Sequence, residues 1–340
     1  MCLLSAHIQQ GNTYPEGQGN ILLHLLGVFE RRGESMKPLR VIELFSGVGA
    51  QRMAFNIVSE RTGLKFDFVA QCEIDKYAVK SYNAIHGETP NLGDITKVET
   101  LPECDILTWS FPCQSLSMAG KKEGMKEGTE TESSLAWEVI RLLKCSHRPE
   151  WLVMENVPAI TYKGNIKDFN QIIKALDNLG YINRYGIFNA TDYGVAQDRD
   201  RCMMVSHLSG AVPDFPKPIP LKHVIRDYLE PEVDKKYYLS EKRLKGVIAA
   251  SEREREKGNG FVFEPVPLDG ISKTITTKSE RKTGTYVLER ERMTPPILVG
   301  MLSPKVFKLD IMRRVYSIDG PAPALHTKLA NFPFFLVGSE

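Results

Sequence analysis

The chain has few cysteines, and none of them stands in a metal-binding or disulfide pattern. Six cysteines are spread over 340 residues, and no two form a Cys-x-x-Cys pair. This spacing argues against a zinc site and a disulfide framework, and it fits a reducing compartment. The longest apolar runs, such as residues 21–29, are shorter than the ~20 residues that cross a bilayer. With no secretory signal pattern at its start, we expect a cytoplasmic protein without a membrane partner.

The chain also lacks an excess of charge of one sign. Its 44 basic and 42 acidic residues leave a net charge of +2, which by itself indicates no partner. Residues 273–314 differ, since they carry ten Lys or Arg and four Asp or Glu, a local excess of six. This excess is a modest indication of a nucleic-acid partner, and a solvated surface explains it equally well.

Apolar runs alternate with helical patterns over the first two thirds of the chain. The sequence predicts strands at residues 39–45, 66–73, 105–110, 151–155, 183–188 and 201–207, and helices at 52–60, 76–85, 134–144 and 167–179. This alternation predicts an α/β fold with a doubly wound, parallel or mainly parallel sheet. Right-handed crossovers would place the functional site along the edge where the strands end.

Composition divides the chain into three parts. Residues 1–36 have no place in the alternating pattern, so we expect them to lie outside the fold. Residues 37–212 form the predicted main domain. Four prolines within residues 213–220 read as a linker. Residues 213–340 then form a smaller second region that begins with a predicted helix at 240–256.

Glycines and acids follow the first predicted strands. Residues 45–50 read Phe-Ser-Gly-Val-Gly-Ala between a buried strand and a helix, and glycines there let a nucleotide-like ligand approach the backbone. Glu73 and Asp94 follow in similar places, where an acid can bind a ribose diol or an adenine amino group. A structural turn and helix N-caps are the plain alternatives for these positions.

A cysteine and a carboxylate follow two later strands. Cys113, in Pro112-Cys113-Gln114, comes directly after a strand, which is an exposed position for a nucleophile; a buried structural cysteine is the alternative. Glu155 ends the next strand and can serve as a general acid. Arg199 and Arg201 alternate with aspartates, so they either point together into a pocket or form surface ion pairs.

In this order, these segments resemble the DNA cytosine-5 methyltransferase family of bacteria and phages. The resemblance covers residues 39–207, and Pro-Cys-Gln and Glu-Asn-Val are its most specific elements. It implies a Rossmann-like methyltransferase fold, S-adenosylmethionine as cofactor and duplex DNA as substrate. The family flips the target cytosine out of the duplex. Cys113 would add to C6, Glu155 would bind N3 and the amino group, Arg201 would hold O2, and Arg199 would support the pocket.

The same resemblance assigns the binding residues. Glu73 would bind the cofactor's ribose and Asp94 its adenine. The full cofactor set is Phe45, Gly47, Gly49, Glu73, Ile74, Asp94, Ile95 and Pro112, and the substrate set is Gln114 and Gln197.

Two departures from the family affect the expected activity. Glu132 stands where the family usually carries an arginine, and the family's last two motifs are not found after the second region. We therefore expect a truncated, incomplete recognition domain tethered by the linker alone, exposed apolar surface near Phe45 and Val48, and weak turnover. A separately encoded C-terminal fragment would supply the rest. For residues 1–36 we expect an over-extended reading frame, with translation truly starting at Met36. The alternative is that they represent a permuted copy of the family's final motif.

Other functions remain open at this point. The runner-up enzyme is an RNA cytosine-5 methyltransferase, and the basic second region favours duplex DNA over RNA. A catalytically inactive remnant that still binds DNA is the alternative from another class, and a nicotinamide oxidoreductase is a distant third. We expect a monomer that could work beside a cognate restriction endonuclease. The target DNA sequence cannot be read from the chain.

Overall fold

The computed structural model describes residues 37–113, 132–208, 210–229, 239–258 and 265–274, together with the backbone of 286–287 and 297–298. The predictions for residues 1–36, for Gln114 and for most of the chain after residue 274 lie outside these described residues.

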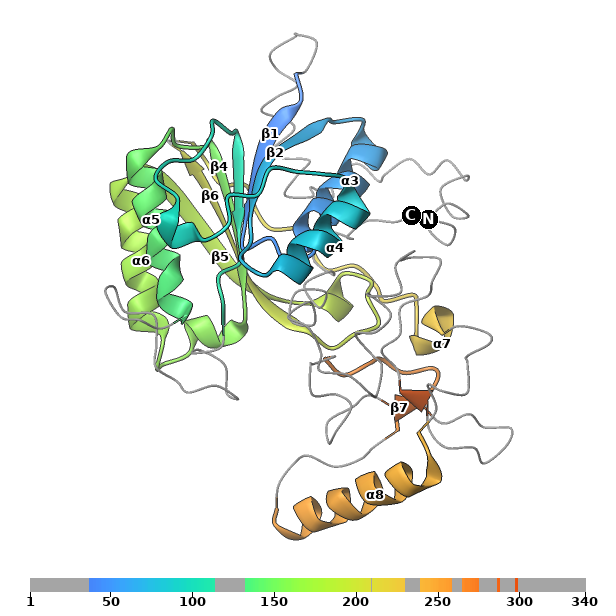
Figure 1. Ribbon diagram of the computed structural model, residues 1–340. Helices are drawn as coiled ribbons and strands as arrows, with labels where there is room; N and C mark the ends of the chain where they lie inside the picture. The colour runs from blue at the N-terminus through green and yellow to red at the C-terminus, as the bar shows by residue number, and fades with distance from the viewer. Residues whose placement is uncertain are drawn as a thin grey trace.

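A six-stranded sheet forms the centre of the fold (Figure 1). Its strand order is β2-β1-β3-β4-β6-β5. The strands are β1 (Leu39–Leu44), β2 (Phe66–Cys72), β3 (Ile106–Trp109), β4 (Trp151–Asn156), β5 (Tyr181–Asn189) and β6 (Asp200–Leu208). The first four run parallel, and β6 pairs antiparallel with both β4 and β5. The mainly parallel sheet is confirmed, whereas an entirely parallel sheet is wrong. Because no crossover helix joins β5 to β6, the chain turns back on itself there.

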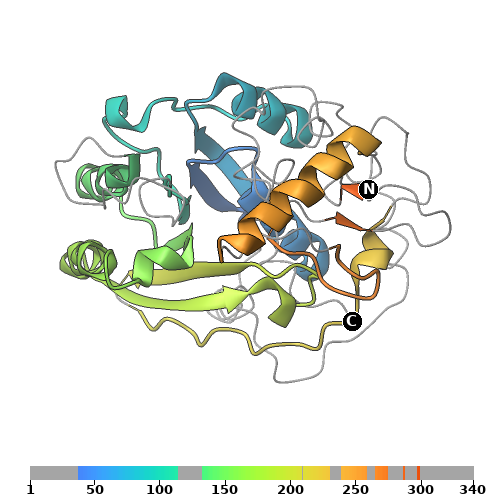
Figure 2. The same cartoon turned by 90° about the horizontal axis from the view of Figure 1, so that it is seen from below.

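Helices cover both faces of the sheet (Figures 1 and 2). They are α3 (Ala50–Thr62), α4 (Lys76–His86), α5 (Ala136–Cys145) and α6 (Ile166–Asn178). Side chains alternate along β1: Ile42 and Leu44 pack in the core cluster that contains α5 and α6, whereas Val41 packs with Phe55 of α3. One strand therefore serves two cores, which explains why apolar residues occur on both of its faces.

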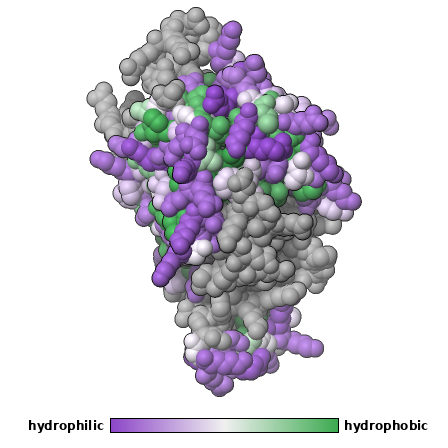
Figure 3. Space-filling view, turned by 90° about the vertical axis from the view of Figure 1, so that its left-hand side faces the viewer, coloured by the Kyte–Doolittle hydropathy of each residue, from purple (hydrophilic) through white to green (hydrophobic). Residues whose placement is uncertain are grey.

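The surface over α5 and α6 is mainly hydrophilic, with apolar residues scattered over it (Figure 3). On α6, Phe169, Ile172 and Leu176 are buried, while Lys167, Gln171 and other polar residues are exposed. Among the described residues, no helix combines the length and apolar character needed to span a membrane.

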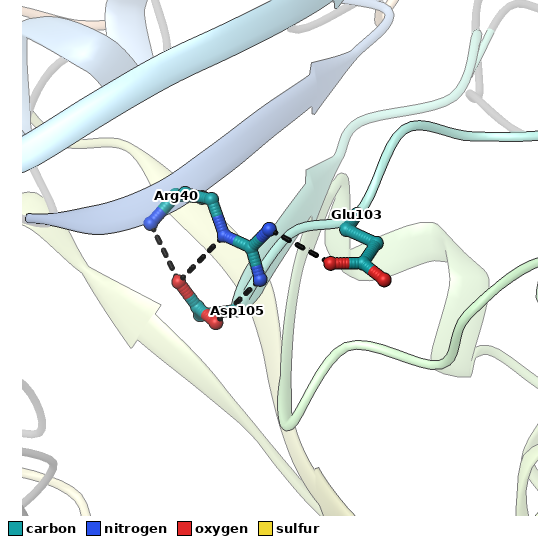
Figure 4. A network of polar contacts seen from close by, with 3 residues as sticks. All are labelled: Arg40, Glu103 and Asp105. Carbon is teal, nitrogen blue, oxygen red and sulfur yellow. Dashed lines mark hydrogen bonds and ion pairs between the residues drawn. The ribbon is translucent and has the colours of Figure 1, made fainter.

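Arg40 joins the starts of two strands at the edge of the sheet opposite the predicted site (Figure 4). Its backbone N–H donates to Asp105 Oδ2 at 2.7 Å, and its guanidinium pairs with Glu103 at 3.0 Å and with Asp105 at 3.4 Å. The side chains are partly exposed, so this network aligns β1 with β3 more than it stabilises the fold.

The second region contacts the sheet's carboxyl edge directly. It contains α7 (Ile225–Tyr228), α8 (Glu241–Glu256), β7 (Tyr286–Val287) and β8 (Ile297–Leu298), with β7 and α8 below the sheet in Figure 1. Asp198 N–H donates to Ser272 O at 2.7 Å, and Ser272 N–H donates to Ala196 O at 2.8 Å. The expectation of a tether through the proline-rich linker alone is therefore wrong. The division at residue 212 stays a prediction.

The apolar side chains of the glycine turn between β1 and α3 are buried. Val48 is fully buried and Phe45 is 9% exposed. The expectation of exposed apolar surface near these two residues is wrong, because Phe45 packs in the core cluster and Val48 O accepts a hydrogen bond from His86 Nε2 of α4 at 3.1 Å.

Candidate active site

The turn between β1 and α3 has a backbone that few side chains tolerate. Phe45, Gly47 and Gly49 all have positive φ angles, of 57°, 58° and 79°. A Cβ atom on Gly49 would collide with the imidazole of His86 and lie 2.8 Å from the Tyr82 ring. Both the backbone conformation and the close approach of α4 therefore require glycine at position 49.

Glu73 holds this turn from the neighbouring strand. Gly47 N–H donates to Glu73 Oε2 at 2.8 Å, and Asp75 N–H donates to Oε1 at 3.0 Å. Each carboxylate oxygen has two lone pairs and can accept a second hydrogen bond. Glu73 can thus both fix the turn and accept from a ribose diol, which fits a nucleoside-containing cofactor.

The neighbouring acids act as helix caps. Asp75 accepts from the N–H groups of Tyr77 and Ala78 and caps α4. Asp94 accepts from the backbone N–H and the hydroxyl of Thr96 and caps the 3-10 helix Ile95–Lys97. These hydrogen bonds from Thr96 hold the pKa of Asp94 below its usual value. The plain N-cap interpretation is correct for Asp94, and its carboxylate keeps lone pairs for an amino group.

Two isoleucines next to these acids have opposite environments. Ile74 is 74% exposed at the end of β2, where an apolar side chain can cover the face of an adenine ring. Ile95 is buried in the core cluster under α5. Arg141 of α5 fixes that segment, because its Nη2 donates to Ile95 O at 3.1 Å and to Val98 O at 2.8 Å.

Cys113 follows β3 at the carboxyl edge of the sheet, where it and Pro112 are half-buried. The segment before it is fixed from β4, since Asn156 Nδ2 donates to Phe111 O at 3.1 Å. The parallel pairing of Trp109 with Met154 places the ends of β3 and β4 side by side. Cys113 therefore follows β3, and Glu155 lies at the end of the adjacent strand β4.

The other described cysteines are poor candidates for a nucleophile. Burial raises the pKa of Cys104 and of Cys202 to about 12, so both stay protonated thiols at neutral pH. Cys72 is buried, and its thiol donates to Gly93 O. Cys145 is exposed, but it ends α5 at the other edge of the sheet.

Glu155 and Arg201 form a buried ion pair. Arg201 Nε lies 2.7 Å from Glu155 Oε1, and their side chains are 11% and 7% exposed. Arg199 is 2% exposed. The alternating aspartates point the other way: Asp198 and Asp200 are exposed and accept from Asn189 Nδ2. The surface ion-pair alternative for the two arginines is therefore wrong.

Gln197 lies where the two regions meet. It is half-buried and pairs as an isolated parallel bridge with Ser272. Its neighbours Ala196 and Asp198 make the backbone hydrogen bonds to Ser272 described above. No group of three potential metal ligands occurs among the described residues.

A buried polar network behind the glycine turn escaped the sequence analysis. Glu43 accepts from Arg52 N–H at 3.2 Å and from Tyr82 Oη at 2.9 Å. Arg52 Nη1 donates to Tyr82 Oη and to Thr89 Oγ1, and its Nη2 donates to His86 O. Glu43 reads as one more strand residue, so its partners on α3 and α4 become evident only in three dimensions.

Comparison with known proteins gives a consistent family. Residues 39–299 match the family described as C-5 cytosine-specific DNA methylase. The chain is 32% identical over 269 residues to the type II methyltransferase M.DsaV of Dactylococcopsis salina, covering 77% of this chain and 74% of that protein. It is 36% identical over 258 residues to M.HpaII of Haemophilus parainfluenzae, covering 73% and 69%.

Solved structures support the same fold. The Entamoeba histolytica methyltransferase EhMeth superposes with a TM-score of 0.62 at 17% identity, over 88% of this chain and 96% of that one. S. pombe Dnmt2 gives a TM-score of 0.59 at 19% identity, over 88% and 94%. The Rossmann-like methyltransferase fold expected from the sequence is confirmed. With the glycine turn, its acids and the strand-end cysteine in place, the chain belongs to the family of C-5 cytosine-specific DNA methylases, which use S-adenosylmethionine, and it is a DNA (cytosine-5-)-methyltransferase.

Proposed function

We propose that this chain methylates C5 of cytosine in duplex DNA through a covalent bond between Cys113 and C6 of the base. The observation that supports the proposal is that Cys113 follows β3, while Glu155, paired with the buried Arg201 of β6, lies at the end of the adjacent parallel strand β4. A half-buried thiol at the same sheet edge as a buried acid and an arginine suits nucleophilic attack on a flipped, hydrogen-bonded base.

The chemistry divides among these three side chains. The Cys113 thiolate adds to C6, and the electron pair of the C5–C6 bond moves toward C5. In its protonated form Glu155 donates its proton to N3 and accepts a hydrogen bond from the amino group, which neutralises the negative charge that thiolate addition places on the ring. Arg201 uses Nε for Glu155 and Nη1 for the Asp200 carbonyl, while Nη2 carries two further donors for the base O2. Arg199, buried next to it, supports the pocket.

The cofactor supplies an electrophilic methyl group when it is bound. C5 takes that methyl, a base or water then removes the C5 proton, and the Cys113 sulfur leaves as the C5–C6 double bond re-forms. Glu73 would accept from the ribose, and Asp94 from the adenine amino group. The turn residues Phe45, Gly47 and Gly49, with Ile74, Ile95 and Pro112, would line the rest of the site.

The division of labour along the chain belongs to the same proposal. Residues 37–212 would bind the cofactor and carry the chemistry, and residues 213–340 would contact the target sequence. Gln197, which pairs with Ser272 at the junction of the two regions, would contact DNA, as would Gln114. We expect the enzyme to act as a monomer.

The test is methyl transfer from radiolabelled cofactor to duplex DNA, with transfer RNA as the competing substrate. We expect label in the 5-methylcytosine of duplex DNA with the wild type and none with Cys113→Ser. Label in transfer RNA alone would contradict the DNA assignment in favour of the RNA alternative. Equal labelling by Cys113→Ser would contradict the mechanism.

A further inference from the structure

Gln51 bridges the cofactor turn and the segment that carries Cys113. It is the second residue of α3, two positions after Gly49, and the residue is 9% exposed. Gln51 Nε2 donates to Ser110 Oγ at 2.7 Å. Ser110 is the first residue after β3, so one short hydrogen bond joins the start of α3 to the end of the nucleophile's strand.

Ser110 and Phe111 are held from both sides. Ser110 N–H donates to Leu44 O at the end of β1, and Phe111 O accepts from Asn156 of β4. These contacts come from the two strands that flank β3. Gln51 adds the contact that comes from the helix behind the glycine turn, so a side-chain hydrogen bond links the helix after the turn to the segment that leads to Cys113.

Placing a glutamine at this position also buries an amide oxygen that the packing of the fold does not require. Gln51 Oε1 is buried, and no hydrogen-bond partner for it occurs among the residues that the structure describes. A buried unsatisfied acceptor destabilises the fold, and an apolar side chain of similar length would avoid this penalty. A glutamine at this position is therefore better explained by its contact with Ser110 than by packing.

We propose that Gln51 is a positioning residue that fixes the distance between the methyl-donor site and Cys113. The inference rests on the proposed function of Cys113. Methyl transfer needs the nucleophile, the base and the donor in one geometry, and small displacements lower the rate of the chemical step. Cofactor affinity depends on the turn itself, which Glu73 holds independently of Gln51.

The kinetic signature is a loss in kcat without a loss in cofactor binding. A neutral hydrogen bond contributes about 1 kcal/mol, so we expect Gln51→Met to lower the single-turnover methylation rate roughly 5- to 10-fold. KM for S-adenosylmethionine should stay within about twofold, since the contacts of the turn remain. The melting temperature should stay level or rise, because the substitution removes the unsatisfied oxygen.

A double-mutant cycle makes the test specific. Ser110→Ala should give a similar loss, and the Gln51→Met/Ser110→Ala double variant should be no slower than either single variant, because both remove the same bond. Gln171→Met, the same change at an exposed position of α6, serves as the matched control and should match the wild type.

Three results would overturn the inference: an unchanged rate in Gln51→Met, a rise in KM in place of a fall in kcat, or losses from the two single variants that multiply in the double variant. A rate loss that follows a lower melting temperature would also count against it, as a purely structural effect. Failure of the proposed function itself looks different, because the wild type would then not methylate duplex DNA at all.

Discussion

His86 provides a sharp test of how the glycine turn is supported. Its Nε2–H donates to Val48 O at 3.1 Å, and its ring packs against Gly49 and Tyr82. Burial lowers the pKa of His86 to about 4, and the positive charge of Arg52 adds to the effect. The imidazole is therefore neutral at physiological pH and acts only as a hydrogen-bond donor to the turn.

The sign of the pH dependence follows from the two states. The unfolded chain binds a proton on this histidine near pH 6.5, and the folded chain does so near pH 4. Between these values the unfolded state holds more protons, so the free energy of unfolding falls as the pH falls from 6.5 to 4. A pKa difference of this size corresponds to about 3 kcal/mol, and we expect about 2 kcal/mol because the ring keeps some solvent contact.

His86→Gln keeps an N–H donor for Val48 O and removes the titration. Urea unfolding at about pH 7 and about pH 4.5 should show that the variant loses about 2 kcal/mol less than the wild type over this interval. His147→Gln, at an exposed position, should behave like the wild type. Equal pH dependence in His86→Gln and the wild type would refute the reasoning.

Further predictions concern the turn, the pocket and the adenine side. Gly49→Ala should lower the free energy of unfolding by more than about 2 kcal/mol, measured by urea unfolding, because the new methyl group meets His86 and the backbone keeps its positive φ. Glu155→Gln should lower the single-turnover methylation rate by more than about 10², since a positioned acid contributes that much. Arg141→Met removes the hydrogen bonds to the carbonyls of residues 95 and 98, which hold the segment that follows Asp94. Because Asp94 and Ile95 are proposed to bind the cofactor, this change should raise the cofactor Kd about 5- to 10-fold, measured by calorimetry.

The sequence predicted best what depends on local pattern. Strands such as β1 and β4 are rich in large apolar residues, and each was placed to within a residue or two. Asp75 and Ser240 mark the helix starts that their side chains cap. The motifs in their order, above all Pro-Cys-Gln and Glu-Asn-Val, were enough to indicate the family before any contact was known.

What the sequence could not predict depends on contacts between distant segments. The direction of β6 follows from the turn that precedes it, and the buried ion pair of Arg201 with Glu155 depends on β4 lying beside β6. The partners of Glu43 lie on two helices, and the bridge from Gln197 to Ser272 joins positions 75 residues apart. None of these pairings leaves a local signal in the chain.

The covalent bond at Cys113 is the central claim, and trapping tests it directly. In a duplex that carries 5-fluorocytosine at the target position, fluorine replaces the C5 hydrogen and cannot be removed as a proton is, so the enzyme should stay attached after methyl transfer. We expect a denaturation-resistant protein–DNA complex with the wild type and with Cys145→Ser, the matched change at an exposed cysteine, and none with Cys113→Ser. An equal yield of the complex with Cys113→Ser would contradict the account.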